Sequence, residues 1–203
     1  MADPQFHIPS VDLRSTGAPD RRYPLRYATA VDNTLLAEMG AQTFADSFAA
    51  DNTPENMQAY LAASFSPEKQ ARELADPASR FLIIEQDGQA IGYARLHFGP
   101  APAVIAARQP MEIVRFYARK EWIGMRVGAQ LMQACLREAK SAGCDIVWLD
   151  VWEQNPRAIA FYRKWGFEQV GAQVFQLGDD MQNDWLMARA IHPSAWNETH
   201  DHD

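Results

Sequence analysis

The sequence predicts an α/β fold built on one mixed sheet of about six to seven strands. Strand and helix patterns alternate from Met111 to Phe167, as they do in an α/β unit. Regular apolar alternation on both sides of Asp87 and Gly88 predicts an antiparallel hairpin. The chain has 203 residues, of which 47% are hydrophobic, so it can bury one substantial core and a second domain is not expected.

The part of the chain before residue 80 predicts one short strand and three helices. Residues 25–29 suit a strand, and apolar residues recur at helical spacing over residues 31–48. Thr-Pro-Glu at residues 53–55 predicts a helix start, because threonine can cap the helix, proline suits its first position and glutamate suits its dipole. Ser-Pro-Glu at residues 66–68 repeats this signal for a third helix, which ends before Asp76.

The rest of the chain predicts strands that alternate with two helices. The hairpin comes first, and a loop with three prolines then leads to a strand that starts at Met111. Apolar residues at helical spacing and Gly143 as a stop predict a helix, and Gly166 ends another. The expected elements are strands over 81–86, 89–98 and 111–118, a helix over 123–141, a strand over 146–151, a helix over 155–165 and closing strands over 167–177 and 183–191.

Composition and charge exclude several classes of protein. The formal net charge of −7 argues against a protein that binds nucleic acid by neutralising phosphates. No apolar stretch approaches the roughly 18 to 20 residues of a membrane span, and residues 1–10 do not resemble a signal peptide, so we expect a cytoplasmic protein that binds no membrane. Cys135 and Cys144 have no partners at metal-ligand spacing, so no metal is expected.

The turn between the strand at 111–118 and the next helix predicts an anion site. Gly124 and Gly128 lie where the helical pattern begins. Backbone N–H groups at such a turn, together with the positive end of the helix dipole, can hold phosphate, and glycine lets the phosphate approach closely. The alternative is that these glycines only form a tight connection.

The motifs from Glu112 to Phe167 resemble the GNAT superfamily of acetyl-CoA-dependent N-acetyltransferases. The carriers are the strand and turn described above, then Asn155-x-x-Ala158-x-x-x-Tyr162 and the Gly-Phe pair at residues 166–167. The resemblance implies a GNAT domain over residues 24–191, between an irregular arm over 1–23 and a polar tail over 192–203. It also implies helices on both faces of the sheet and a splay between the fourth and fifth strands.

The resemblance implies acetyl-CoA as co-substrate and assigns residues to it. The pyrophosphate loop departs from the family pattern, since Ile123 stands where Gln or Arg is usual and Arg126 where the first glycine is usual. A pantetheine arm is expected to pair with the strand edge at residues 116–118. The expected cofactor residues are Phe116, Tyr117, Ala118, Ile123, Gly124, Met125, Arg126, Val127, Gly128, Ala129, Asn155, Arg157, Ala158, Tyr162 and Lys164.

Several of these residues have simpler explanations. Asn155 could be a helix cap alone, and Tyr162 a packed aromatic residue, although both face the same side of the predicted helix. Phe116 could belong to the core. Arg157 and Lys164 could lie on a solvated helix face.

The reaction implied by the resemblance is direct transfer of the acetyl group to a neutral amine. Tyr162 is expected to protonate the departing thiolate. An alkylammonium has a pKa of roughly 10, so a base must remove a proton before attack. Glu112 is the leading candidate for this base, with an ordinary strand-end carboxylate as an equal alternative, and Asp150 is the reserve.

The expected acceptor is a primary amine, and a polyamine is the first choice. The choice is made by resemblance, because residues 44–75, 146–167 and 174–187 are similar to bacterial spermidine and spermine acetyltransferases. Other small amines, peptide or protein amines, and a non-catalytic acyl-CoA sensor are the alternatives. A homodimer would cover the apolar residues 174–177, and a monomer is the alternative.

Acidic and aromatic side chains are candidates for contacts with this acceptor. Asp46, Asp51 and Glu55 carry the negative charge that a polycation would need, although an acidic surface usually serves solubility. Trp152 and Glu153 follow the strand at 146–151 and are expected to line the acceptor cleft.

Overall fold

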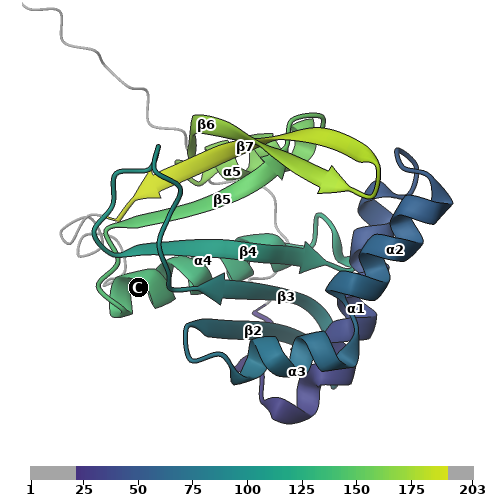
Figure 1. The fold of residues 1–203 in the computed structure, drawn as a ribbon. Coiled ribbons are helices and arrows are strands. Elements are labelled where there is room, and N and C mark those ends of the chain that lie inside the picture. The colour runs from purple at the N-terminus through teal and green to yellow at the C-terminus, as the bar shows by residue number, and fades with distance from the viewer. Residues whose placement is uncertain (1–21, 192–203) are drawn as a thin grey trace, which may run out of the picture.

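A seven-stranded sheet organises the chain. In this computed structural model, which describes residues 22–191, the strands follow the order β1-β2-β3-β4-β5-β7-β6 (Figure 1). Among the described strands only the β4–β5 pair is parallel, so the predicted mixed sheet is confirmed. The elements are β1 (Leu25–Tyr27), η1 (Ala30–Asp32), α1 (Asn33–Phe48), α2 (Pro54–Ser64), α3 (Pro67–Ala75), β2 (Ser79–Gln86), β3 (Gln89–His97), β4 (Pro110–Ala118), η2 (Lys120–Trp122), α4 (Val127–Ser141), β5 (Ile146–Trp152), α5 (Pro156–Lys164), β6 (Glu168–Leu177) and β7 (Asp180–Ala190).

Three helices begin at the caps that the sequence signals. The hydroxyl of Thr53 accepts a hydrogen bond from the Asn56 amide at the start of α2, and Ser66 does the same for α3. Oδ1 of Asn155 accepts from the Ala158 amide at 3.0 Å at the start of α5. Each cap is followed by proline, which suits the first helical position because its missing N–H would have no partner there.

The helix expected from Ile123 begins later, at Val127. Gly124 has a φ of 85° and Arg126 a φ of 66°, and a helix cannot continue through residues in this left-handed region. A short 3₁₀ helix, η2, precedes the turn and was not expected.

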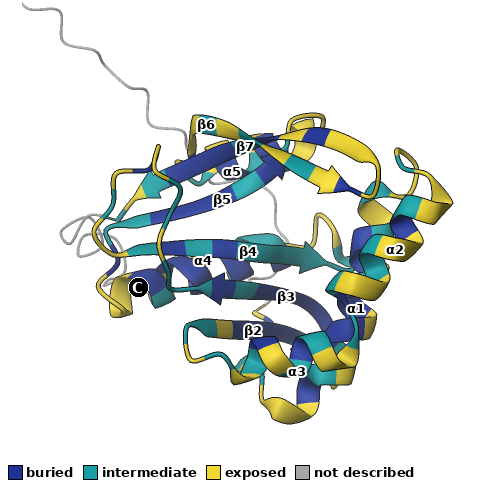
Figure 2. Cartoon of the chain, viewed as in Figure 1, coloured by how far each residue is buried: buried dark blue, intermediate teal, exposed yellow. Residues whose placement is uncertain are grey.

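Helices cover both faces of the sheet. α4 and α5 pack on one face, where Leu131 and Ile159 belong to the same buried cluster as Leu149 of β5. α1 covers the other face, where Leu36 packs with Ile83 of β2, and α3 lies beside it (Figure 1). Figure 2 shows the result: β2, β3 and β5 are largely buried and β4 is mostly of intermediate exposure, while exposed residues are prominent on the outer sides of α2 and α3 and on the β6–β7 hairpin.

The packed part of the chain begins before β1. Tyr23, which belongs to the predicted arm over residues 1–23, is buried against α4 and the turn before it. Its hydroxyl donates a hydrogen bond to the Met125 carbonyl at 3.2 Å, and its ring makes an edge contact with Trp122. Residues 1–21 of the arm and the predicted tail over 192–203 lie outside the described residues.

β4 and β5 separate after three paired positions. Pro110, Met111 and Glu112 pair with residues 146–148, and within the described residues the ladder ends there. β4 continues to Ala118 while still paired with β3, and a register shift in that pair leaves Val114 as a bulge. The splay expected between the fourth and fifth strands is therefore confirmed.

A buried ion network ties α3 to the sheet. Glu73 of α3 forms ion pairs with Arg95 of β3 and Arg115 of β4, and all three side chains are largely buried. The Arg95 Nη1–Glu73 Oε1 distance is 2.7 Å. Because charges taken out of water need close partners, the network depends on each member.

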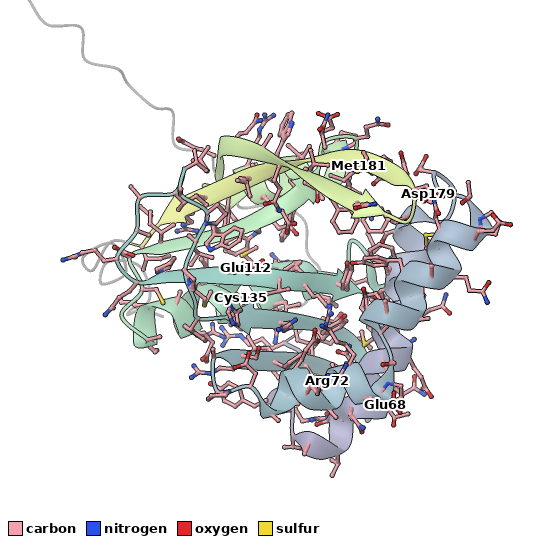
Figure 3. The ribbon with its side chains drawn as sticks, in the orientation of Figure 1. Glu68, Arg72, Glu112, Cys135, Asp179 and Met181 are labelled. Atoms are coloured by element: carbon pink, nitrogen blue, oxygen red, sulfur yellow. The ribbon has the colours of Figure 1, made fainter. Side chains whose placement is uncertain are left out.

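We expect Glu73→Gln to destabilise the protein by about 3 kcal/mol, because two buried guanidinium groups would lose their carboxylate. Urea denaturation measures the change. Glu68→Gln is the matched control, since Glu68 is exposed on the same helix (Figure 3) and should cost about 0.5 kcal/mol or less. Equal effects of the two substitutions would contradict the structural role given to Glu73.

Candidate functional site

A cleft of about 500 Å³ opens where β4 and β5 separate. We divide most of its lining into two halves, and Ile113, Val114 and Val151 complete it. The α4 half comprises Phe116, Tyr117, Ala118, Trp122, Ile123, Gly124, Arg126, Gly128, Ala129, Asn155, Arg157, Ala158, Phe161 and Tyr162. The hairpin half comprises Phe44, Ser47, Phe48, Tyr60, Arg115, Asp150, Trp152, Phe175, Leu177, Gln182 and Asp184.

The start of α4 presents backbone N–H groups to the α4 half. In the described part of the chain no side chain caps this helix, in contrast to α2, α3 and α5. Gly128 and Ala129 of its first turn line the cleft, as do Gly124 and Arg126 of the preceding turn. Uncapped N–H groups at the positive end of a helix dipole suit an anion, and the Arg126 guanidinium adds positive charge.

The edge of β4 that faces β5 forms one wall of the cleft. From Ile113 onward β4 pairs with β3 on its other side, while no described strand pairs with this edge. Phe116, Tyr117 and Ala118, all predicted cofactor residues, line the cleft here. Unpaired backbone groups on a strand edge can bind an extended ligand that carries amides.

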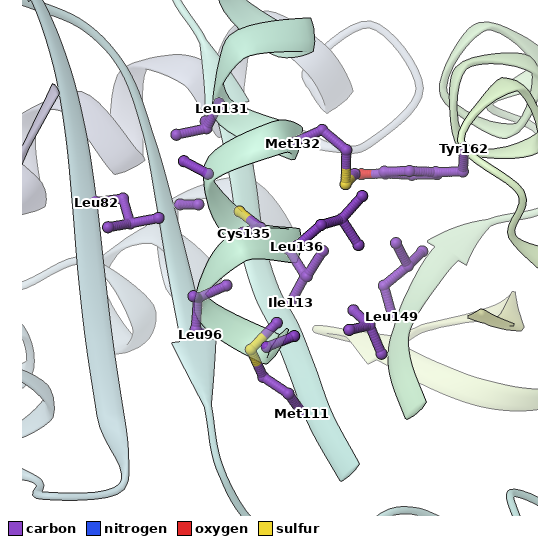
Figure 4. Close-up of a cluster of buried hydrophobic side chains, with 14 of the residues drawn as sticks. Leu82, Leu96, Met111, Ile113, Leu131, Met132, Cys135, Leu136, Leu149 and Tyr162 are labelled. Atoms are coloured by element: carbon purple, nitrogen blue, oxygen red, sulfur yellow. The ribbon is translucent and has the colours of Figure 1, made fainter. Parts of the chain in front are cut away.

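α5 contributes both a cap and an aromatic hydroxyl. Asn155 Oδ1 is committed to the cap, so the amide nitrogen is the part of Asn155 that remains for a ligand. Tyr162 lies two turns further along and lines the cleft, and its ring contacts Phe116, Phe161 and Phe167. Figure 4 shows Tyr162 beside the buried cluster of α4 and the central strands. Burial raises the pKa of Tyr162, so its hydroxyl stays protonated at neutral pH.

Three predicted cofactor residues do not line the cleft. Val127 is fully buried in the core. The Met125 N–H donates to the Trp122 carbonyl, and the Met125 side chain is exposed. Lys164 is exposed on α5. Lys164 therefore lies on the solvated face of the helix, which is the alternative given above.

Glu112 lies at the closed end of the splay, beside the cleft and not in its lining. It is the third residue of β4 and is labelled in Figure 3. Burial raises the pKa of its carboxyl to about 7, with a further contribution from the charge of Asp150, while Arg95 opposes the shift. Asp150 itself lines the cleft, and burial raises its pKa too.

The sequence did not point to Asp184. This residue lies on β7, lines the hairpin half and is 7% exposed, and in the described part of the chain its Oδ1 has no hydrogen-bond partner. Burial is the largest cause that raises the pKa of Asp184 to about 7, and the negative charges of Asp150 and Glu153 raise it further. The alternation of side chains along β7 is a signal that could have identified Asp184, because a two-residue period places it on the same buried face of the strand as Leu186.

The aromatic lining of the hairpin half was foreseen only at Trp152. Phe44 and Phe48 come from α1, Tyr60 from α2 and Phe175 from β6, and all four line the cleft. Glu153, also expected to line the cleft, lies outside it.

Comparison with known proteins assigns the chain to a family. Residues 42–167 match the model of the acetyltransferase (GNAT) family. The chain is 35% identical over 150 residues to an uncharacterized N-acetyltransferase of Lactobacillus delbrueckii subsp. lactis, covering 74% of this chain and 87% of that protein. It is 32% identical over 160 residues to an uncharacterized N-acetyltransferase of Mycobacterium tuberculosis, covering 79% and 98%. The chain therefore belongs to the GNAT family and is an N-acetyltransferase.

Solved structures share the fold. The PaiA N-acetyltransferase of Thermoplasma acidophilum, in complex with coenzyme A, matches with a TM-score of 0.66 at 20% identity, covering 84% of this chain and all of that one (100%). The ribosomal-protein-alanine N-acetyltransferase of Brucella melitensis matches with a TM-score of 0.60 at 21% identity, covering 83% and 99%.

The described residues hold neither a cluster of metal ligands nor a helix that could span a membrane. Within residues 22–191, no group of three or more His, Cys, Asp or Glu side chains is placed to hold a metal ion. Over the same range no helix combines the length and apolar character that a membrane span requires.

Glu112 predicts a pH-dependent stability. Its pKa is about 7 in the folded protein and near 4.5 otherwise, so the folded state holds this proton more tightly and the contribution of Glu112 to stability falls as pH rises from about 4.5 to about 7. Glu112→Gln removes this loss, so the variant should gain stability relative to wild type between pH 5 and pH 8. Urea denaturation at both pH values measures the gain, and a difference that is the same at both would contradict the raised pKa.

Proposed function

We propose that this enzyme transfers the acetyl group of acetyl-CoA directly to a primary amine. One observation carries the proposal: the uncapped start of α4, the unpaired edge of β4 and the Tyr162 hydroxyl all lie on a single cleft at the splay. An anion site, an edge for amides and a proton donor are the three features that a thioester nucleotide would use.

The residues present fit acetyl-CoA. Gly124, Arg126, Gly128 and Ala129 would hold its pyrophosphate, since they bring backbone N–H groups and a guanidinium to one end of the cleft. The β4 edge at 116–118 would pair with the pantetheine amides. When bound, acetyl-CoA supplies an activated acetyl thioester.

The proton donor and acceptor lie on opposite faces of the sheet. Tyr162 keeps its proton at neutral pH because it is buried, so it is equipped to protonate a thiolate. Asp150 can take a proton from an amine directly, because it lines the cleft. Glu112 has a pKa of about 7 and interacts with Asp150, so we propose that it receives the proton by way of Asp150.

The acceptor is proposed here only as a primary amine. Asp46, Asp51 and Glu55, which the sequence offered for a polycation, are exposed and do not line the cleft. A polyamine therefore draws support only from the carboxylates inside the cleft. A silent acyl-CoA sensor is disfavoured, because a proton donor and two carboxylates line the cleft where turnover needs them.

Tyr162→Phe should lower kcat by about 100-fold, because the departing thiolate loses its proton donor, while the Kd for acetyl-CoA stays within about twofold. Thiol release measures kcat, and calorimetry measures Kd. Tyr27→Phe is the control, since the Tyr27 ring is 54% exposed and its hydroxyl donates to Glu138 on the outside of α4. Wild-type turnover in Tyr162→Phe would remove this residue as the acid.

Arg126→Glu should raise the Kd for acetyl-CoA by about tenfold, because it replaces a positive charge with a negative one at the proposed phosphate site. Arg126→Gly should raise Kd less, since glycine accepts the left-handed φ of this position. Arg137→Glu makes the same charge change at an exposed position of α4 outside the cleft. Similar Kd values for Arg126→Glu and Arg137→Glu would place the phosphates elsewhere.

A further inference from the structure

The hairpin half of the cleft combines a half-buried carboxylate, Asp150, and a buried one, Asp184, with a continuous set of aromatic rings. We call Phe44, Phe48, Tyr60, Trp152 and Phe175 the aromatic wall. Ring centroids lie 4.5 Å apart for Phe44–Tyr60, 4.6 Å for Phe44–Phe48, 5.5 Å for Tyr60–Phe175 and 6.1 Å for Phe48–Trp152. Such a wall buries a flat apolar group well, and most of its contact with a ligand is apolar.

Asp150 and Asp184 form the polar end of this half. They lie on neighbouring strands, since Asp150 pairs with Leu186 and Trp152 with Asp184, which puts the two carboxylates in diagonal positions on one face. Oδ2 of Asp150 accepts a hydrogen bond from Gln173 at 3.1 Å. Oδ1 of Asp184 is buried with no hydrogen-bond partner among residues 22–191, which is costly unless a ligand supplies a donor.

A cation is the ligand that this pair lacks. Each carboxylate is penalised by burial, and the charge of Asp150 adds to the penalty on Asp184. A primary ammonium carries three N–H donors and a positive charge, so it can satisfy Oδ1 of Asp184 and reduce the repulsion at once.

Within the described residues, this half offers no free cation to hold an anionic group of the acceptor. Among the described residues that line it, Arg115 alone is cationic. Its Nη1 donates to Gln70 and Glu73, and its Nη2 donates to the Ser64 carbonyl and to Glu73, so all four terminal N–H groups are taken. The carboxylate of a free amino acid would therefore find no free cationic partner among these residues.

We propose that the acceptor is a monoamine with an apolar, aromatic body, whose ammonium binds between Asp150 and Asp184 while its ring packs on the aromatic wall. This inference rests on the proposed function and names the substrate class of the same cleft. A polyamine fits less well, because both carboxylates that line this half lie together, and a second ammonium would reach the aromatic wall without a counter-ion.

A panel of amines at saturating acetyl-CoA tests the proposal. We expect kcat/KM for 2-phenylethylamine to exceed that for spermidine by about tenfold or more, and that for L-phenylalanine by about 100-fold, because L-phenylalanine adds a carboxylate that has no cationic partner in this half. An alanine-initiated peptide is the fourth arm. A preference for spermidine, the peptide or the amino acid overturns the inference.

Variants separate binding from folding. Asp184→Asn should raise the Kd of 2-phenylethylamine for the enzyme–coenzyme A complex by about tenfold, with the Kd for acetyl-CoA unchanged. Asp46→Asn is the matched control, because Asp46 is exposed on α1 and bonded to Gln42. Phe175→Ala provides a second test, since it shortens the aromatic wall and leaves both carboxylates in place.

The outcomes distinguish failure of the inference about the acceptor from failure of the proposed function. If acetyl-CoA binds and some amine is acetylated, but Asp184→Asn and Phe175→Ala bind 2-phenylethylamine as wild type does, the inference fails and the proposed function stands. If the wild-type enzyme binds no acetyl-CoA, the proposed function fails.

Discussion

The cleft depends on the early end of the hydrogen-bond ladder between β4 and β5. After Glu112 pairs with Trp148 the two strands diverge, and the bulge at Val114 lets β4 turn away while it stays paired with β3. Continuous pairing would close the space that residues of both strands now line. The unpaired edge of β4 remains as backbone polar groups that need partners, and for this reason we regard it as a binding surface.

The two faces of the sheet give the two halves of the cleft their different chemistry. On the α4 side, Tyr162 packs among aromatic rings, and burial keeps its hydroxyl neutral. On the other side, Asp150 and Asp184 are carboxylates whose pKa values burial raises. Alternation along β5 separates these environments, because Val151 faces the core cluster while Asp150 and Trp152 face the other way.

Local signals in the sequence predicted most of the fold and the α4 half. The caps at Thr53, Ser66 and Asn155 act through neighbours within three residues, so the sequence shows them directly. The start of α4 was misplaced because Arg126 adopts a left-handed conformation that no sequence rule assigns to arginine. The hairpin half was largely missed because Asp184 reaches it through the insertion of β7 between β5 and β6, a long-range pairing that period alone does not reveal.

Hydrogen–deuterium exchange with and without acetyl-CoA tests the central claim most directly, because it reads the backbone amides of the splay. We predict that acetyl-CoA slows exchange in the outer part of β4, over residues 114–118, and in the first turn of α4. We predict no slowing in the β2–β3 hairpin, which lies away from the cleft lining. Protection confined to other elements, with β4 and α4 unchanged, would contradict a cofactor site at the separation of β4 and β5.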